Sequence, residues 1–430
     1  MNTNRKGWIV TMAGMGLNLA LGILYAWSVF KKALVAPISD GGYGWTNQQA
    51  TLPYTVAIAM FAVMMIPAGR LQDKLGPRIV AMTGGLLTAC GLIVASFATA
   101  ENPIPAIVGF GLFAGTGFGL GYAASTPAAI KWFPPEKKGL ITGLVVAGFG
   151  IAPIYISPVA KTLLANYGIA MSFRILGIAF LVTATVFSSL IKNPEVALNV
   201  AKPGTAKKGV GGDKTWREMI RSPFFYLLWF QFAFAAIAGL MIIGNMASIV
   251  TAQSGGALKA EAAFFVALLA VFNASGRIIA GVLSDYIGRI VTLALVSITQ
   301  ASVLLFFSRF TTFGEFAVGA AVVGLSYGAC LSLFPSTTAD TWGTKSMGLN
   351  YGVLFTAWGV GGVFGPMLAA KIVDATGSYQ TAYNVASMLL LVSFFLAMLN
   401  YVNVSVDVSQ REVTIRLGGR KAEAANEKAA

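Results

Sequence analysis

Residues 69–78 read GRLQDKLGPR and residues 281–289 read GVLSDYIGR, so one short polar motif occurs in each half of the chain. A glycine, an aspartate and a second glycine keep the same spacing in both copies, whereas the arginine that ends the motif slips by one residue. Each copy lies between two long apolar segments. Such a repeat indicates two similar membrane halves, from which secondary transporters build a carrier around a central site. The motif pair therefore predicts a transporter.

The composition excludes an ordinary soluble protein, because 56% of the 430 residues are hydrophobic and only 11% are charged. An apolar run of about 20 residues can cross a hydrocarbon core of about 30 Å as a helix. The first run starts too near the N-terminus and is too long for a cleaved signal peptide, so we interpret it as an uncleaved span. Twelve such runs occur, at about residues 8–30, 50–68, 79–99, 105–130, 139–164, 173–191, 223–250, 262–283, 290–309, 314–339, 348–370 and 380–402.

The formal net charge of +14 could indicate a nucleic-acid partner, but the distribution of the basic residues argues against one. With the N-terminus in the cytoplasm, 22 of the 30 lysines and arginines lie on the cytoplasmic side, and seven lie on the opposite face. This asymmetry follows the positive-inside rule. We therefore expect no nucleic-acid partner, and we expect both termini in the cytoplasm.

The sequence lacks the residues that most catalytic and metal sites need. It has no histidine, and its two cysteines, Cys90 and Cys330, lie inside apolar runs. No Ser/His or Cys/His pair, metal-ligand cluster or Walker-type phosphate loop is therefore available. The GTGFG run at residues 115–119 lies within a membrane span, where small residues let helices approach closely. We expect no enzyme activity, no cofactor and no metal.

Residues 192–222 form the only long polar stretch between apolar runs, with six runs before it and six after it. Their prolines, glycines and basic residues are typical of a mobile linker. We therefore predict an all-α membrane protein with twelve transmembrane helices in two pseudo-symmetric six-helix bundles. The expected parts are a first bundle at residues 1–191, a cytoplasmic linker at 192–222, a second bundle at 223–402 and a cytoplasmic tail at 403–430.

Each motif copy also predicts a gate. Its glycine lets a helix pack closely, and its aspartate can accept bonds from helix amino termini and pair with basic groups. Such charge networks can hold one face of a carrier shut and release it during rocking. The alternative is a simple loop cap with scattered topogenic charge. The gating residues that we expect are Gly69, Asp73, Arg78, Gly281, Asp285 and Arg289.

Arg277 is the one basic residue that the sequence places deep inside the membrane. It lies in the eighth apolar run, about 12 Å from Asp285 along a helix with a rise of about 1.5 Å per residue. A charge there costs at least a few kcal/mol, so it should face a cavity and have a partner. No Asp or Glu lies at matching depth, so we expect a substrate carboxylate, bound by the planar guanidinium. The alternative is hydrogen bonding to main-chain carbonyls between helices.

Further short motifs resemble those of a known family. The motif pair, the six-plus-six layout and the linker are similar to the major facilitator superfamily over the whole chain. Four short motifs narrow this resemblance, namely YAWSVF at residues 25–30, WFP at 132–134, FPST at 334–337 and NYG at 350–352. They resemble motifs of the oxalate:formate antiporter family, which is related to the monocarboxylate transporters, and of bacterial L-lactate transporters in particular.

The resemblance implies a secondary active transporter of small monocarboxylates such as L-lactate or pyruvate, with proton symport by alternating access. The alternative is an organic-anion exchanger of the oxalate/formate type. A third hypothesis is a membrane sensor without net transport. Where animal monocarboxylate carriers have an acid, this chain has Asn273, an amide that cannot titrate. The proton can then travel with the acid itself or through a carboxylate near a loop, such as Asp340. We expect a monomer in the bacterial cytoplasmic (inner) membrane.

The resemblance also implies the substrate site. An arginine at the place of Arg277 is the organic-anion ligand in related carriers. Asn273 lies one turn earlier on the same helix face, where it can donate to the carboxylate, orient the guanidinium or bond another helix. The aromatic residues can complete the cavity or simply pack, and Asn245 is a weaker candidate. The aromatic candidates are Tyr25, Tyr122, Tyr327, Phe355 and Trp358.

Trp358 is the sharpest departure from the antiporter family, which carries a lysine at this place. A second cation has been exchanged for a large indole. The cavity should therefore prefer one carboxylate joined to a short apolar tail, because a second carboxylate would be desolvated and unpaired.

Overall fold

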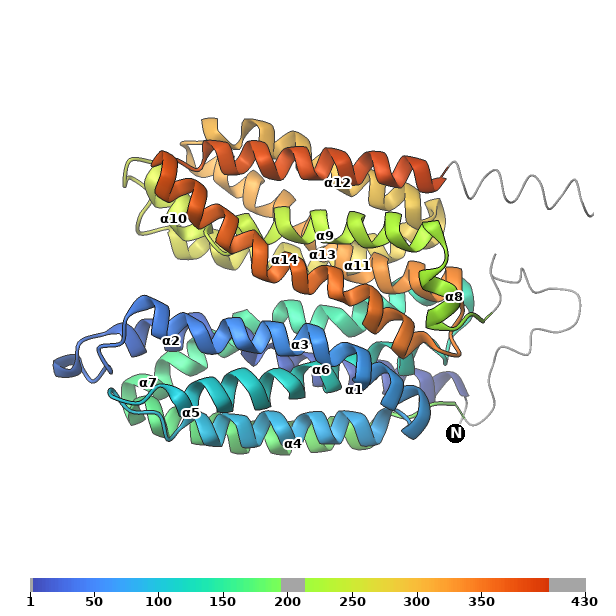
Figure 1. Ribbon diagram of the computed structural model, residues 1–430, viewed down its shortest axis with the longest axis horizontal. Helices are drawn as coiled ribbons and strands as arrows, with labels where there is room; N and C mark the ends of the chain where they lie inside the picture. Colours follow the sequence, from blue (N-terminus) through green and yellow to red (C-terminus); the bar gives the residue numbers. More distant parts are fainter. Residues whose placement is uncertain (1–2, 195–212, 402–430) are drawn as a thin grey trace, which may run out of the picture.

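The computed structural model describes residues 3–194 and 213–401, and within these ranges all of the regular structure is helical (Figure 1). The first half contains α1 (Thr3–Leu21), the 3-10 helix η1 (Gly22–Ala26), α2 (Trp27–Val35), η2 (Ile38–Asp40), α3 (Asn47–Leu75), α4 (Pro77–Ala95), α5 (Ile104–Ala106), the π-helical η3 (Ile107–Ala114), α6 (Gly115–Ile130), η4 (Pro135–Lys137) and α7 (Lys138–Leu190). The second half contains α8 (Trp216–Ile220), α9 (Pro223–Ile243), α10 (Met246–Gln253), α11 (Ala262–Ile287), α12 (Arg289–Phe306), η5 (Phe307–Arg309), α13 (Phe313–Trp342), α14 (Met347–Thr376) and a last helix, Gln380–Tyr401.

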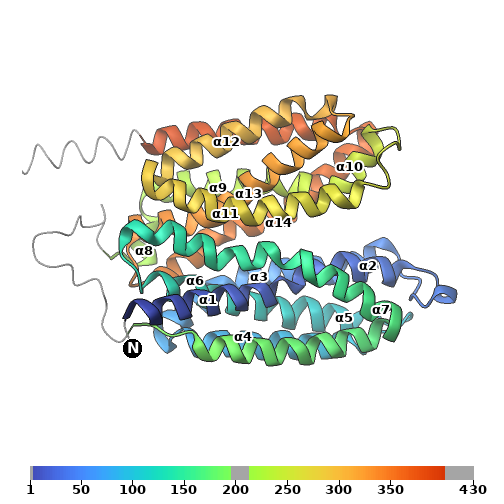
Figure 2. The ribbon, with the colours of Figure 1, turned by 180° about the vertical axis from the view of Figure 1, so that it is seen from behind.

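Eleven helices of the described residues are long and apolar enough to cross a membrane. One of them, α7, has 53 residues and would extend about 80 Å if it were straight, more than twice the thickness of a bilayer core. Gly168 interrupts it with φ 70° and ψ −179°, and the chain turns back there (Figure 2). The predicted runs 139–164 and 173–191 lie on either side of this glycine. The expected twelve membrane-crossing segments are therefore confirmed.

Three predicted runs are less regular than expected, and one of them, at 105–130, is π-helical over η3. The first run, at 8–30, passes through the short 3-10 helix η1 between α1 and α2. The run at 223–250 is broken after Ile243, and a new helix, α10, begins at Met246. Apolar composition alone cannot locate such breaks, because both sides of each break are equally hydrophobic.

The second glycine of each motif copy makes the sharp turn between two consecutive spans. Gly76 separates α3 from α4, and Gly288 separates α11 from α12. Their φ angles are 84° and 94°, in a region that residues with a Cβ rarely adopt. The backbone of this turn therefore explains why a glycine stands at the same place in both copies.

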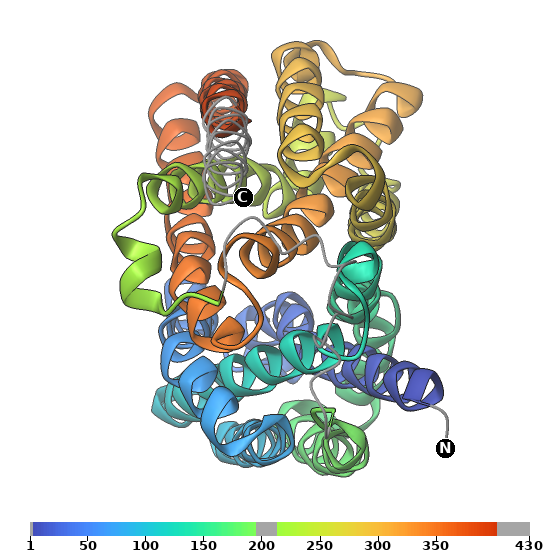
Figure 3. The same cartoon turned by 90° about the vertical axis from the view of Figure 1, so that its right-hand side faces the viewer.

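Helices α1–α7 form one bundle, and the helices from α8 onward form the other (Figures 1 and 2). Across the interface, α3 packs on α14 and α7 packs on α11. The two bundles lie closer together at the end that carries α8 than at the end that carries α2 and α10 (Figure 1). We call the closer end, which also carries Asp73 and Asp285, the motif end; Figure 3 looks along the bundles from that end. Most of the predicted linker, at 195–212, and the whole of the predicted tail, within 402–430, lie outside the described residues.

Candidate functional site

Arg277 lies on α11 at the interface between the two bundles, and its side chain is completely buried. Its Nε donates to the Asn273 side-chain oxygen at 3.1 Å. Its Nη1 donates to the main-chain carbonyl of Val146 on α7, which belongs to the other bundle. Its Nη2 has no hydrogen-bond partner among the described residues, although the Tyr25 hydroxyl faces the same guanidinium. One nitrogen of a buried, permanently charged group is thus still available to an anion.

Two glycines of α7 let this arginine reach the other bundle. A Cβ on Gly143 would lie 2.4 Å from the main-chain oxygen of Arg277. A Cβ on Gly150 would lie 3.1 Å from the guanidinium carbon and from Nε. Since Val146 lies between these glycines, the face of α7 toward the arginine has no side chain at positions 143 and 150. A larger side chain at either position would hold α7 and α11 apart.

A small cavity adjoins the guanidinium, between the two bundles. Its free volume is about 10 Å³, roughly the room that one water molecule needs. Six of its eight lining side chains are aromatic, and both bundles contribute to it. The cavity is therefore closed in this conformation, and a molecule larger than water can enter it only when the bundles separate or the rings rotate. The lining residues are Tyr25, Phe61, Tyr122, Phe149, Arg277, Leu331, Phe355 and Trp358.

One tyrosine next to the cavity has its hydrogen-bonding direction set by a neighbour. The indole Nε1 of Trp358 donates to the Tyr327 hydroxyl at 2.7 Å. An indole can only donate, so the tyrosine oxygen accepts this bond and its own proton stays free for another acceptor. Phe355 stacks on Trp358 with ring centroids 4.9 Å apart, which fixes the indole. The arrangement leaves the Tyr327 hydroxyl with a free O–H donor next to Trp358, which lines the cavity.

The structure brings the predicted site residues together. Arg277 and four of the predicted aromatic residues line the cavity directly, whereas Asn273 and Tyr327 reach it through their bonds to Arg277 and Trp358. Asn245 instead donates to the main-chain oxygen of Met241 in its own segment and does not line the cavity. The four aromatic lining residues are Tyr25, Tyr122, Phe355 and Trp358.

Sequence reasoning did not single out three lining residues and one main-chain acceptor. Phe61, Phe149 and Leu331 also line the cavity, but nothing in the sequence separates them from the many other apolar residues of the spans. The Val146 carbonyl accepts the arginine bond, and a main-chain acceptor has no sequence signal of its own. The glycines on either side of it were the one available indication.

At the motif end, each motif aspartate caps a helix of the opposite bundle. Asp73 accepts hydrogen bonds at 3.3 and 3.0 Å from first-turn N–H groups of α14. Asp285 accepts two bonds at 3.0 Å from first-turn N–H groups of α7. A carboxylate at a helix N-terminus is favourable because it meets unpaired N–H groups and the positive end of the helix dipole. The two aspartates therefore join the bundles by related contacts.

The first glycine of each copy allows main chain to touch main chain. A Cβ on Gly69 would lie 2.0 Å from the carbonyl oxygen of Gly348, and a Cβ on Gly281 would lie 2.3 Å from that of Gly139. Only glycine, whose side chain is a single hydrogen atom, fits at these two positions. The close approach brings the aspartates within reach of the helix ends that they cap.

Ion pairs add to the contact on one side of the interface. Arg289 pairs with Asp285 at 2.6 Å and with Asp340 at 2.8 Å, and Lys138 pairs with Asp340 at 3.0 Å. The Lys138–Asp340 pair crosses from α7 to α13 and so links the two bundles. Lys138 was not among the predicted gating residues. In the first bundle, burial lowers the pKa of the Lys131 ammonium, and the negative charges of Asp73 and Asp213 oppose that shift.

Arg78 does not take part in this network. Its side chain is exposed and forms no ion pair with any described residue. Arg78 differs from Arg289 in its position on the helix. Arg289 is the first residue of α12, whereas Arg78 is the second residue of α4, one place later in the motif. One residue turns a side chain by about 100° around a helix with about 3.6 residues per turn.

Comparisons with known proteins agree with this architecture. The Major Facilitator Superfamily matches residues 7–366 and 241–419. The oxalate:formate antiporter of Oxalobacter formigenes is 28% identical over 398 residues, which cover 92% of this chain and 91% of that protein. Monocarboxylate transporter 13 of Rattus norvegicus is 28% identical over 395 residues, covering 90% and 86%. The fucose:proton symporter FucP of E. coli has a TM-score of 0.69 at 17% identity, covering 91% of this chain and 98% of that one. As the sequence predicted, this chain belongs to the Major Facilitator Superfamily, a family of membrane transporters and not of enzymes.

Proposed function

We propose that this transporter carries small monocarboxylates such as L-lactate and pyruvate, in symport with protons, by alternating access between the two bundles. The observation that carries the proposal is the buried Arg277 guanidinium, which has one unpaired nitrogen and faces an aromatic cavity. No carboxylate lines that cavity. A substrate carboxylate would supply the missing negative charge.

The chemistry of the cavity favours one carboxylate on a short apolar body. One fixed positive charge matches one negative charge, and the free proton of the Tyr327 hydroxyl can bond a substrate oxygen. The aromatic walls suit a methyl group rather than a second carboxylate, which would lose its hydration without gaining a partner. Lactate and pyruvate have these features, whereas oxalate has two charges.

Substrate binding can be coupled to bundle movement through the size of the closed cavity. A carboxylate can bind the Nη1 and Nη2 edge of Arg277 with two hydrogen bonds while Nη1 keeps its bond to the Val146 carbonyl, because Nη1 carries two N–H groups. The closed cavity, with a free volume of about 10 Å³, has no room for that carboxylate until the bundles separate or the rings rotate. The ligand thus binds the separated conformation better, which is the differential affinity that a ligand needs to shift a conformational equilibrium.

The proposal also covers orientation, assembly and the coupling ion. The excess of basic residues on the motif side favours a cytoplasmic motif end and cytoplasmic termini, in a bacterial inner membrane, with a monomer as the working unit. Asn273 cannot carry a proton, and Asp340 already pairs with two cations. The proton then moves with the acid itself, or through Asp340 when that network opens. No cofactor is required.

Radiolabelled L-lactate uptake into proteoliposomes tests the proposal. An inward proton gradient should drive lactate accumulation, and a protonophore should abolish it. Arg277→Lys is the matched inactive variant, because it keeps one positive charge but not the planar pair of donors. Its uptake should fall to the level of empty liposomes, with an unchanged melting temperature. If Arg277→Lys took up lactate as fast as the parent protein does, the assignment of Arg277 to the substrate site would be contradicted.

An organic-anion exchanger is the second candidate, and one observation favours it. The curated relative of Oxalobacter formigenes, 28% identical over nearly the whole chain, is an oxalate:formate antiporter. Uptake that ignores the proton gradient but requires an anion inside the liposomes would establish exchange. Such a result would replace symport and leave the role of Arg277 intact.

A further inference from the structure

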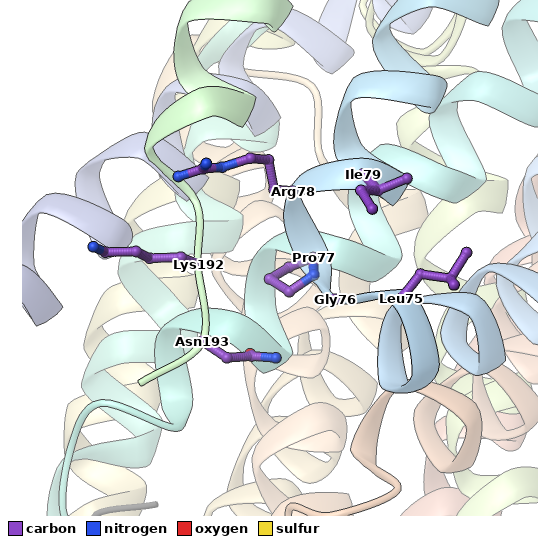
Figure 4. Close-up of a pocket in the computed structure, with 7 residues that line it drawn as sticks. All are labelled: Leu75, Gly76, Pro77, Arg78, Ile79, Lys192 and Asn193. Atoms are coloured by element: carbon purple, nitrogen blue, oxygen red, sulfur yellow. The ribbon is translucent and has the colours of Figure 1, made fainter. Parts of the chain in front are cut away.

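A groove at the motif end of the first bundle lies outside the proposed transport site (Figure 4). Its volume is about 470 Å³, within the range of small-molecule pockets. The turn between α3 and α4 contributes Leu75, Arg78 and Ile79, and the chain that leaves α7 contributes Lys192 and Asn193. The transport mechanism uses none of these side chains.

The polar groups of the groove fit a phosphate ester. Arg78 and Lys192 bring two positive charges, the lining contains no carboxylate, and neither cation forms an ion pair within the part of the chain that the structure describes. The side-chain oxygen of Asn193 is buried and lacks a hydrogen-bond partner there. Two cations can bind a phosphate, and the unpaired oxygen can accept a bond from a headgroup hydroxyl.

The divergence of the two motif copies explains why Arg78 is free for this role. Its counterpart Arg289 is held by Asp285 and Asp340 in the second bundle. The slip by one residue removes Arg78 from the equivalent contact and directs it to the groove beside Lys192. The arginine is therefore present in both halves, but it forms ion pairs in the second bundle and lines the groove in the first.

The groove lies at the level where the chain leaves the membrane. Its lining residues lie at the ends of three candidate spans, Gln48–Leu75, Pro77–Ala95 and Pro135–Leu190, or within three residues of those ends. Leu75 and Ile79 are each 54% exposed. From the groove, exposed apolar side chains continue at helical spacing along two helices that pack on each other, with Met82 and Leu86 on α4 and Leu190 and Val186 on α7. An amphiphile with a charged head and acyl tails matches this surface, whereas a free phosphate would leave the apolar part uncovered.

We infer that this groove binds the headgroup of an anionic phospholipid, with Arg78 and Lys192 on the phosphate, the Asn193 oxygen on a headgroup hydroxyl and the acyl chains along α4 and α7. Phosphatidylglycerol has this chemistry, because its phosphate is charged and its glycerol carries hydroxyl donors. The site is independent of the proposed substrate, so its test does not require transport.

Native mass spectrometry of the full-length protein tests the inference. The purified protein is mixed with equal amounts of phosphatidylglycerol and phosphatidylcholine that have the same acyl chains, and the ratio of the two bound lipids is measured. The protein should prefer phosphatidylglycerol. A basic residue near an anionic headgroup contributes about 1 kcal/mol, so Arg78→Gln with Lys192→Gln should reduce the preference about 30-fold, or about 2 kcal/mol at about 1.4 kcal/mol per tenfold change.

Two further variants separate this site from general surface charge. Lys74→Gln with Lys137→Gln removes two exposed basic residues from the same end that do not line the groove, and it should keep the preference. Arg78→Lys with Lys192→Arg keeps both charges and should also keep it. An equal loss in the Lys74/Lys137 variant, or no preference in the parent protein, would overturn the inference. Displacement of the lipid by millimolar inorganic phosphate would assign the groove to soluble anions and likewise overturn it.

Discussion

Gly143→Ala should shift the carrier away from the conformation in which the motif end is closed. The added Cβ would lie 2.4 Å from the main-chain oxygen of Arg277, about 1 Å inside ordinary van der Waals contact of 3.4–4 Å. Because the neighbouring atom belongs to the main chain, no change of rotamer can relieve the clash, and α7 must move away from α11. Overpacking of this kind costs about 1–3 kcal/mol, which changes the ratio of two conformations about 5- to 150-fold.

Pulsed electron paramagnetic resonance can measure this shift. Lys137→Cys and Tyr286→Cys place spin labels on exposed positions of the two bundles at the motif end, once the two native cysteines have been replaced by alanine. Gly143→Ala should increase the population with a long distance between the labels. Gly314→Ala is the matched control, because no atom lies within 4 Å of its added Cβ. A Gly143→Ala distance distribution identical to that of the parent would refute the idea that this close approach holds the motif end shut.

Other predictions follow from the cavity and the motif aspartates. Pyruvate should inhibit lactate uptake by the unmodified protein and oxalate should not; tight oxalate binding, measured by calorimetry, would revive the dicarboxylate exchanger. Trp358→Lys should weaken lactate uptake and raise the affinity for oxalate, since it adds a second cation beside Arg277. Trp358→Phe removes the donor to the Tyr327 hydroxyl, and a loss of about 0.5–1.5 kcal/mol is expected in lactate affinity; an unchanged affinity would show that this bond does not orient the tyrosine. Asp285→Asn keeps an acceptor for the first turn of α7 but loses its charge, so the closed motif end should weaken by about 0.3–2 kcal/mol. The same spin labels report it, and a closed population equal to that of the parent would contradict the capping role.

The sequence pointed to Arg277 because a charged side chain inside a long apolar run is unusual. An arginine inside a long apolar run has to be explained, and its two candidate partners, a substrate carboxylate or a main-chain carbonyl, could both be stated in advance. The structure adds that the Val146 carbonyl holds one nitrogen while another stays unpaired. The remaining cavity wall could not be predicted, because Phe61 and Phe149 differ from other phenylalanines of the spans only in the direction that packing gives them.

In the two motif copies, the repeat predicts the main-chain features but not the partners of the charged side chains. Features that act through the main chain recur in both halves, namely the close glycine contact, the glycine turn and the aspartate that caps a helix of the other bundle. They recur because the same backbone path requires them in each half. Features that act through charged side chains differ. Asp340, in the last turn of α13, belongs to an ion-pair network, whereas Lys131, just after the equivalent helix α6, interacts with Asp73. A side chain can change partner without a change of backbone, as the one-residue slip of Arg78 illustrates. Two halves with one backbone plan can therefore use their charged side chains differently. Asp285, Arg289 and Asp340 of the second bundle form ion pairs, including one across the interface to Lys138, whereas Arg78 of the first bundle lines an outward-facing basic groove.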